Sequence, residues 1–101
     1  MRRFRFRPEA LAEFEEAVDY YLELSPEVAS RFVDAFEAAV DYARQNPQAV
    51  VRVKGGTRRC NLRRFPYALI FRLVDDVIEI IAVMHARREP EYWQTRVRER
   101  E

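Results

Sequence analysis

Several kinds of residue are scarce in this chain of 101 residues, and each scarcity excludes a class of protein. The single cysteine, Cys60, excludes an internal disulfide and a zinc site built from cysteines. With only two glycines, the chain has no glycine-rich loop that binds phosphate. No apolar run reaches the roughly 18 residues of a membrane span, and no apolar segment follows the basic N-terminus as it would in a signal peptide. We therefore expect a small cytoplasmic protein without metal, cofactor or membrane contact.

The chain does contain 49% hydrophobic residues, which suffices for one modest core and predicts a single domain over residues 1–101. The 18 basic and 17 acidic residues nearly balance, but they are separated along the sequence. Ten acidic residues lie between positions 8 and 41, whereas positions 42–74 carry eight bases and no acid. Seven of those bases are arginines, which bind phosphate through a planar fork. The basic half favours a polyanion or an acidic protein as partner. Alternatively, the many arginines reflect only genome composition or heat adaptation.

Hydrophobic periodicity predicts a strand followed by two helices in the first half of the chain. Residues 3–7 alternate strictly (RFRFR), which indicates a strand with its two phenylalanines facing inward. Pro8 suits the first turn of a helix, and Ser25 followed by proline suits the start of a second one. The two expected apolar stripes are Leu11, Phe14, Val18 and Tyr21, and then Ala29, Phe32, Phe36, Ala39 and Ala43. Because their connection is so short, the helices should form an antiparallel hairpin.

The second half changes to the period of strands. A turn at residues 54–57 leads to a strand that ends near Arg63, and residues 65–74 (FPYALIFRLV) are apolar enough for a central strand. Asp75 and Asp76 form a tight turn before a last strand over residues 77–85. The expected fold is therefore α+β, in the order β-α-α-β-β-β, with the helix hairpin on one face of a four-stranded antiparallel sheet. A short helix within residues 87–98 is possible, and the strand order stays open.

Side-chain alternation predicts which residues share a face of the sheet. If Ile78, Ile80 and Met84 face the helices, then His85 points away from them. Arg72 marks the corresponding open side of the central strand. We expect four side chains to share the face without helices: Arg59, Arg63, Arg72 and His85. A shift of one residue in the strand pairing would move them to the opposite face.

Two short segments carry a resemblance to a known family. These are residues 63–67 (RRFPY) at the start of the central strand, and residues 83–88 (VMHARR) followed by Pro90, Tyr92 and Trp93. With the helix hairpin, the chain resembles the RelE/ParE superfamily of type II toxin–antitoxin toxins, the plasmid stabilisation type, over residues 6–96. The resemblance implies a toxin that a cognate antitoxin, encoded by an adjacent gene, holds inactive. RelE-like members cleave ribosome-bound mRNA without metal, whereas ParE-like members poison DNA gyrase.

The resemblance leaves the target of this toxin open. Arg59 and Arg63 stand where the RelE pattern has basic residues, and Tyr92 stands at its base-stacking tyrosine. Ala68 and Asn61, in contrast, stand where RelE-type nucleases carry an arginine and a lysine. The arginines, His85 and Tyr92 favour an mRNA interferase. Ala68, Asn61 and the ending in residues 85–88 (HARR) favour a gyrase inhibitor that is not an enzyme. A non-toxic α+β module that binds proteins is a third alternative.

For RNA cleavage, we expect His85 to act as general acid or base, with Arg59, Arg63 and Arg87 around the phosphate. Alternatively, His85 caps the end of its strand and hydrogen-bonds the terminal segment. Candidate contacts with the nucleic acid or the target are Lys54, Arg58, Arg64, Arg72, Arg88 and Tyr92. Lys54, Arg58 and Arg64 equally suit acidic groups of the antitoxin, and the Tyr92 ring either stacks on a base or packs. Trp93 should pack on the sheet edge and Cys60 in the core.

Overall fold

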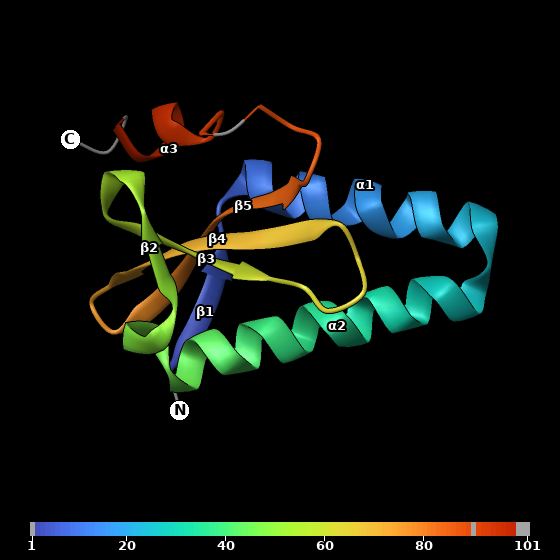
Figure 1. The fold of residues 1–101 in the computed structure, drawn as a ribbon, viewed down its shortest axis with the longest axis horizontal. Coiled ribbons are helices and arrows are strands. Elements are labelled where there is room, and N and C mark those ends of the chain that lie inside the picture. The colour runs from blue at the N-terminus through green and yellow to red at the C-terminus, as the bar shows by residue number, and fades with distance from the viewer. Residues whose placement is uncertain (1, 90, 99–101) are drawn as a thin grey trace.

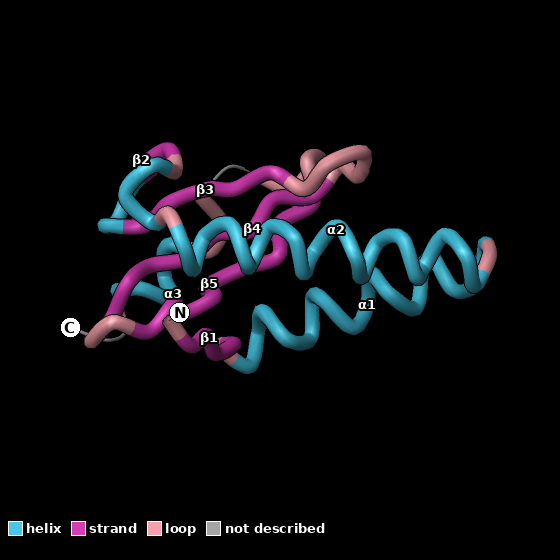
Figure 2. Tube along the Cα trace, turned by 90° about the horizontal axis from the view of Figure 1, so that it is seen from below, coloured by secondary structure: helices cyan, strands magenta, loops and turns pink. Residues whose placement is uncertain are grey.

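A computed structural model describes residues 2–89 and 91–98 and shows a helix pair lying across one face of a five-stranded sheet (Figure 1 and Figure 2). The predicted α+β fold and order of elements are confirmed, with one strand more than expected. The elements are β1 Arg3–Phe6, α1 Pro8–Leu24, α2 Pro26–Gln45, β2 Val51–Val53, β3 Thr57–Asn61, β4 Tyr67–Val74, β5 Val77–His85 and α3 Gln94–Arg98. The additional strand, β2, is only three residues long, which is too short to show a period in the sequence.

The helix hairpin forms where the sequence predicts it. Pro8 occupies the first turn of α1, and the Ser25 Oγ accepts the backbone N–H groups of Glu27 (3.2 Å) and Val28 (3.4 Å) at the start of α2. All five residues of the expected α2 stripe are buried. In α1 the buried residues are Ala10, Ala17 and Tyr21, so that Leu11, placed on the stripe by the sequence, is 39% exposed.

The sheet order is β1-β5-β4-β3-β2. The last three strands form the predicted antiparallel meander, and Asp75 and Asp76 both have positive φ in the two-residue turn between β4 and β5. The prediction of a wholly antiparallel sheet is wrong for β1, which pairs in parallel with β5. A parallel pair needs a long crossover connection, and here the helix hairpin with β2, β3 and β4 provides it.

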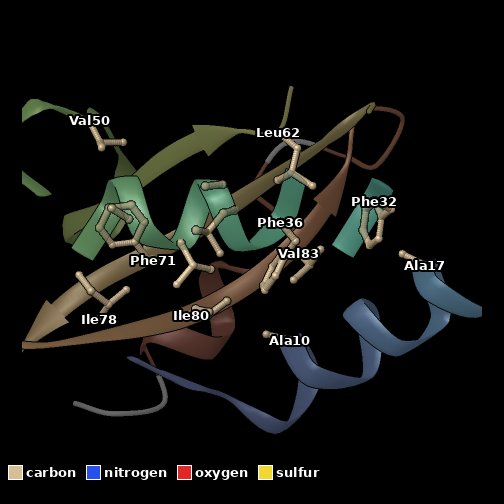
Figure 3. Close-up of a cluster of buried hydrophobic side chains, with 14 of the residues drawn as sticks. Ala10, Ala17, Phe32, Phe36, Val50, Leu62, Phe71, Ile78, Ile80 and Val83 are labelled. Carbon is tan, nitrogen blue, oxygen red and sulfur yellow. The ribbon is translucent and has the colours of Figure 1, made fainter. Parts of the chain in front are cut away.

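The main core lies between the helix pair and the sheet. Figure 3 shows Ala10 and Ala17 of α1 and Phe36 of α2 facing strand residues such as Ile80 and Phe71. Phe6 of β1 packs against this cluster, with its ring centroid 5.8 Å from that of Phe36, as the alternation in β1 predicts. Phe4, predicted to face inward with it, is 40% exposed and lies outside the cluster. Small alanines at these helix positions let α1 and α2 approach the sheet closely.

The sheet face turned away from the helices, called the far face here, is covered in part by the C-terminal segment. Trp93 is 2% exposed and belongs with Val97 to a second buried cluster that also contains Ala68, Ile70, Ile81, Ala82 and Met84. The prediction that Trp93 packs is confirmed, and the prediction of a bare far face is wrong. Among the described residues, the structure contains no helix with the length and apolarity of a membrane span.

Candidate functional site

An irregularity in the pairing of β4 and β5 determines on which face His85 lies. The ladder passes from the Ile70–Ala82 pair to the Phe71–Ile80 pair and thereby omits Ile81. One extra residue in a strand reverses the faces of all residues beyond it. Consequently Met84 joins the far-face cluster, and His85 lies on the helix side, with its ring 4.9 Å from Tyr67. The predicted orientation of both residues is wrong for this reason.

The arginines expected beside His85 lie elsewhere. Arg59 pairs with Ile70 across the ladder, which places it on the far face, and its Nε donates to the Asn61 Oδ1 at 3.0 Å. Arg72 also lies on the far face, where its Nε donates to the buried Glu79 carboxylate at 2.7 Å. The predicted site that shares one face is therefore not assembled.

Arg63 and Arg87 complete the predicted catalytic set, and neither joins a common centre with Arg59. Arg63 is exposed beside α2, where it lines a groove of about 520 Å³ with Arg31, Asp34 and Arg64. Arg87 is exposed in the turn after β5, and its backbone N–H donates to the His85 Nδ1 at 2.9 Å. This bond matches the alternative in which His85 ties the strand end to the terminal segment. The catalytic roles stay predictions.

The remaining predicted contact residues are divided between internal bonds and the surface. The Lys54 Nζ lies 3.4 Å from the Glu91 carboxylate, and the Arg58 Nη1 donates to the Val50 carbonyl at 2.8 Å. Arg64 is exposed in the turn after β3 with a φ of 68°. The Arg88 guanidinium lies 3.7 Å from the centre of the Tyr92 ring and covers one face of it.

His85 opens onto a groove of about 550 Å³ between α1, the end of β5 and the turn that follows it. We call it the tyrosine groove, because four tyrosines and two glutamates line it together with His85 and Arg88: Tyr20, Tyr21, Tyr67, Tyr92, Glu13 and Glu16. Burial raises the pKa of Tyr67, and the neighbouring Tyr21, Tyr20 and Glu16 raise it further. The groove thus gathers aromatic surface and negative charge.

Glu13 fixes one wall of the tyrosine groove. Because β1 ends at Phe6, opposite Ile80, the outer edge of β5 has no strand partner beyond that point. The Glu13 carboxylate fills this place by accepting the Val83 backbone N–H at 3.0 Å, the Tyr92 hydroxyl at 2.7 Å and the Arg96 guanidinium at 2.9 Å. Burial, together with the Glu13 carboxylate, raises the pKa of Tyr92 well above its usual range.

The sequence does not single out Glu13, because Glu13 lies outside the apolar stripe expected for the first helix and is one of six acidic residues there. A signal was available, since Ala10 and Ala17 stand three residues before and four residues after Glu13 and share its helix face. Both alanines are buried against the sheet. A carboxylate between two small buried residues indicates a polar partner on the sheet.

Comparison with known proteins identifies the family. Residues 4–90 match the family model described as the ParE toxin of the type II toxin–antitoxin system parDE. The chain belongs to the ParE toxin family. As a ParE toxin it is the toxin component of a type II toxin–antitoxin system, as the motifs in residues 63–67 and 83–88 predicted.

Individual ParE relatives agree with this assignment. Toxin ParE2 of Mycobacterium tuberculosis strain H37Rv is 30% identical over 90 residues, which cover 88% of this chain and 86% of that protein. The solved chromosomal ParDE system from P. aeruginosa aligns at a TM-score of 0.71 with 25% identity, over 86% of this chain and 98% of that one. The intact E. coli RelBE toxin–antitoxin complex shares the fold, with a TM-score of 0.59 and 20% identity over 87% of this chain and 100% of that one.

Proposed function

We propose that this toxin arrests growth by binding DNA gyrase, without cutting mRNA on the ribosome. The observation that carries the proposal is the separation of His85, on the helix side of the sheet, from Arg59 and Arg72 on the far face. Metal-free cleavage of RNA needs the acid or base and the cations around a single phosphate. A sheet lies between these groups here.

The charge near His85 also favours a target other than RNA. Glu16 lines the same groove as His85 and forms no ion pair among the described residues, so its carboxylate repels a phosphate backbone. The charge of Glu13, in contrast, is compensated by Arg96. The Tyr92 hydroxyl donates to Glu13, and Arg88 lies over the Tyr92 ring. This leaves Tyr92 poorly placed to stack on a base, so that packing is the better explanation for its ring.

We further propose that the toxin works in the cytoplasm and is held inactive by an antitoxin from an adjacent gene. The solved ParDE system and RelBE complex, which share its fold, support a partner of this kind. The groove that Arg31, Arg63 and Arg64 line beside α2 offers three guanidinium groups against the single carboxylate of Asp34. Acidic side chains of an antitoxin would complement this groove.

Induction of the gene alone in a bacterium tests the mechanism. We expect growth arrest with double-strand breaks and induction of the SOS response, because gyrase trapped on DNA leaves broken ends. Message cut at codon boundaries would contradict the gyrase proposal. Growth without arrest would remove both toxin mechanisms.

The variant His85→Ala sharpens the same assay. We expect it to arrest growth as fully as the parent toxin, because His85 makes structural contacts with Tyr67 and Arg87. Removal of a general acid or base would instead lower activity by about 10²–10⁴-fold. His85→Gln, which keeps a hydrogen-bond acceptor, serves as the control for a loss of folding, and immunoblots compare the protein levels.

A further inference from the structure

The tyrosine groove holds polar groups that the rest of the described chain leaves unengaged. Glu16 forms no ion pair within residues 2–89 and 91–98, and the hydroxyls of Tyr20, Tyr21 and Tyr67 form no hydrogen bond there. Tyr21 is only 8% exposed, yet it lines the groove. The Tyr21 ring is therefore buried while its hydroxyl is not among the buried unpaired atoms, so the hydroxyl is open to the groove and free to accept a hydrogen bond from a ligand.

The unengaged groups lie close to one another. The ring centroids of Tyr20 and Tyr21 are 5.1 Å apart, and those of Tyr21 and Tyr67 are 6.3 Å apart. Glu16 is near enough to Tyr67 to contribute to its raised pKa. Three tyrosine side chains and one carboxylate thus line the same open groove.

This combination fits a cation, and the form that fits best is a guanidinium group. Aromatic faces attract cations, and a guanidinium lies flat on a ring while its five N–H donors reach carboxylate and hydroxyl oxygens. The chain itself shows the geometry at the rim of the groove, where the Arg88 guanidinium lies 3.7 Å from the centre of the Tyr92 ring.

On the α1 side of the groove, opposite Arg88 and His85, the surroundings agree with a basic occupant. Every charged residue of α1 is acidic, namely Glu9, Glu13, Glu15, Glu16, Asp19 and Glu23. The groove volume of about 550 Å³ exceeds what one arginine side chain needs, which leaves room for its neighbours in a peptide.

We propose that the tyrosine groove receives the side chain of an arginine from a segment of a partner protein. Glu16 pairs with the guanidinium, the hydroxyls of Tyr20, Tyr21 and Tyr67 accept its remaining N–H groups, and the rings stack on its plane. Glu13 stays bound to Arg96 and keeps the wall in place. The inference goes beyond the proposed action on gyrase and stands without it.

The experiment is an NMR titration of the folded toxin with the acetylated and amidated pentapeptide Ala-Leu-Arg-Leu-Ala. We expect chemical-shift changes at groove residues, and no such changes with the matched peptide that carries norleucine in place of arginine. Glu16→Gln should weaken binding about tenfold or more, because a hydrogen-bonded charge pair is lost. Tyr21→Phe should weaken it by a smaller factor, because one hydroxyl acceptor is lost.

Glu15→Gln is the matched control, since Glu15 is also exposed on α1 but does not line the groove. It should bind the arginine peptide as the parent protein does. Equal binding of both peptides, equal weakening by the two glutamine variants, or shift changes outside the groove would overturn the proposal. Spermidine that binds more tightly than the peptide would also overturn it, because a free polyamine would then be the better occupant.

Discussion

Glu13 shows how one side chain can join three segments that are distant in the sequence. Its carboxylate binds the backbone of β5 at Val83 and two residues of the C-terminal segment, Tyr92 and Arg96. The Arg96 Nη1 also donates to the Ile81 carbonyl at 2.9 Å, so the Val83 N–H and the Ile81 carbonyl at the β5 edge each have a side-chain partner. Polar groups buried at such an edge are costly unless they are paired in this way.

The buried tyrosines predict a loss of stability in alkali. Burial raises the pKa values of Tyr21, Tyr67 and Tyr92 in the folded protein. Above about pH 10 the unfolded chain loses these protons while the folded chain keeps them, so the free energy of unfolding should fall as the pH rises. The decline should approach about 1.4 kcal/mol per pH unit for Tyr92, whose pKa is raised well above its usual range, and Tyr21 and Tyr67 should add to it in the same direction. Urea unfolding between about pH 9 and pH 11.5 measures it.

Tyr92→Phe isolates one contribution to that decline. Phenylalanine has no proton to lose, so the free energy of unfolding of the variant should fall less steeply with pH than that of the parent protein. The same slope in both proteins would show that Tyr92 does not keep its proton in the folded state.

At the scale of elements, the boundaries of the helices are set by local groups. The Ser25 Oγ accepts two backbone N–H groups at the start of α2, and Pro26 follows as the first helical residue. Such a cap satisfies donors that the first turn of a helix cannot pair internally. The hairpin therefore turns at a position that the sequence alone reveals.

Removing this cap should destabilise the toxin measurably. Ser25→Ala leaves the N–H groups of Glu27 and Val28 without their acceptor and should cost about 1 kcal/mol. Ser30→Ala is the matched control, because Ser30 is exposed within α2 and should change stability by less than about 0.5 kcal/mol. Thermal unfolding followed by circular dichroism compares the two variants, and equal costs would refute the role of Ser25 as a cap.

The omitted residue in β5 is the element-scale feature that sequence reasoning could not find. Ile81 is a β-branched apolar residue among others of its kind, and nothing in its type marks a break in the alternation. The break arises from the pairing of the two strands: Ile70 pairs with Ala82 and Phe71 pairs with Ile80, so Ile81 has no partner in β4. The faces of Met84 and His85 follow from that pairing and not from their own neighbours.

At the scale of the whole molecule, the charge pattern of the sequence becomes a division between layers. The acidic first half forms the two helices, and the basic second half forms most of the sheet. Figure 2 shows these layers side by side, with the helix pair across one face of the sheet. A partner that covers both layers must therefore present charges of both signs.

The second buried cluster makes the C-terminal segment part of the folded unit. Trp93→Ala should lower the free energy of unfolding by about 3–5 kcal/mol, because it opens a cavity over Ile70 and Met84 on the far face. Leu24→Ala is the control, since Leu24 is 62% exposed at the tip of the hairpin and should cost less than about 1 kcal/mol. Urea unfolding decides, and similar costs would show that the segment is not packed on the sheet.

The sequence by itself determined what depends on neighbours within a few residues. The helix start at Pro8, the cap at Ser25 and the turn at Asp75 are local matters of backbone geometry and hydrogen bonding. The family motifs were also readable, because they are runs of adjacent residues.

Only the tertiary structure decided what depends on pairing between distant segments. The parallel partner of β1, the face of His85 and the contacts of Glu13 each require that strands find their register before side chains can meet. A shift of one residue exchanges the two faces of a strand, and several registers leave the local pattern equally satisfied. The free energy of the packed whole selects one of them, and with it the set of side chains that surrounds the tyrosine groove.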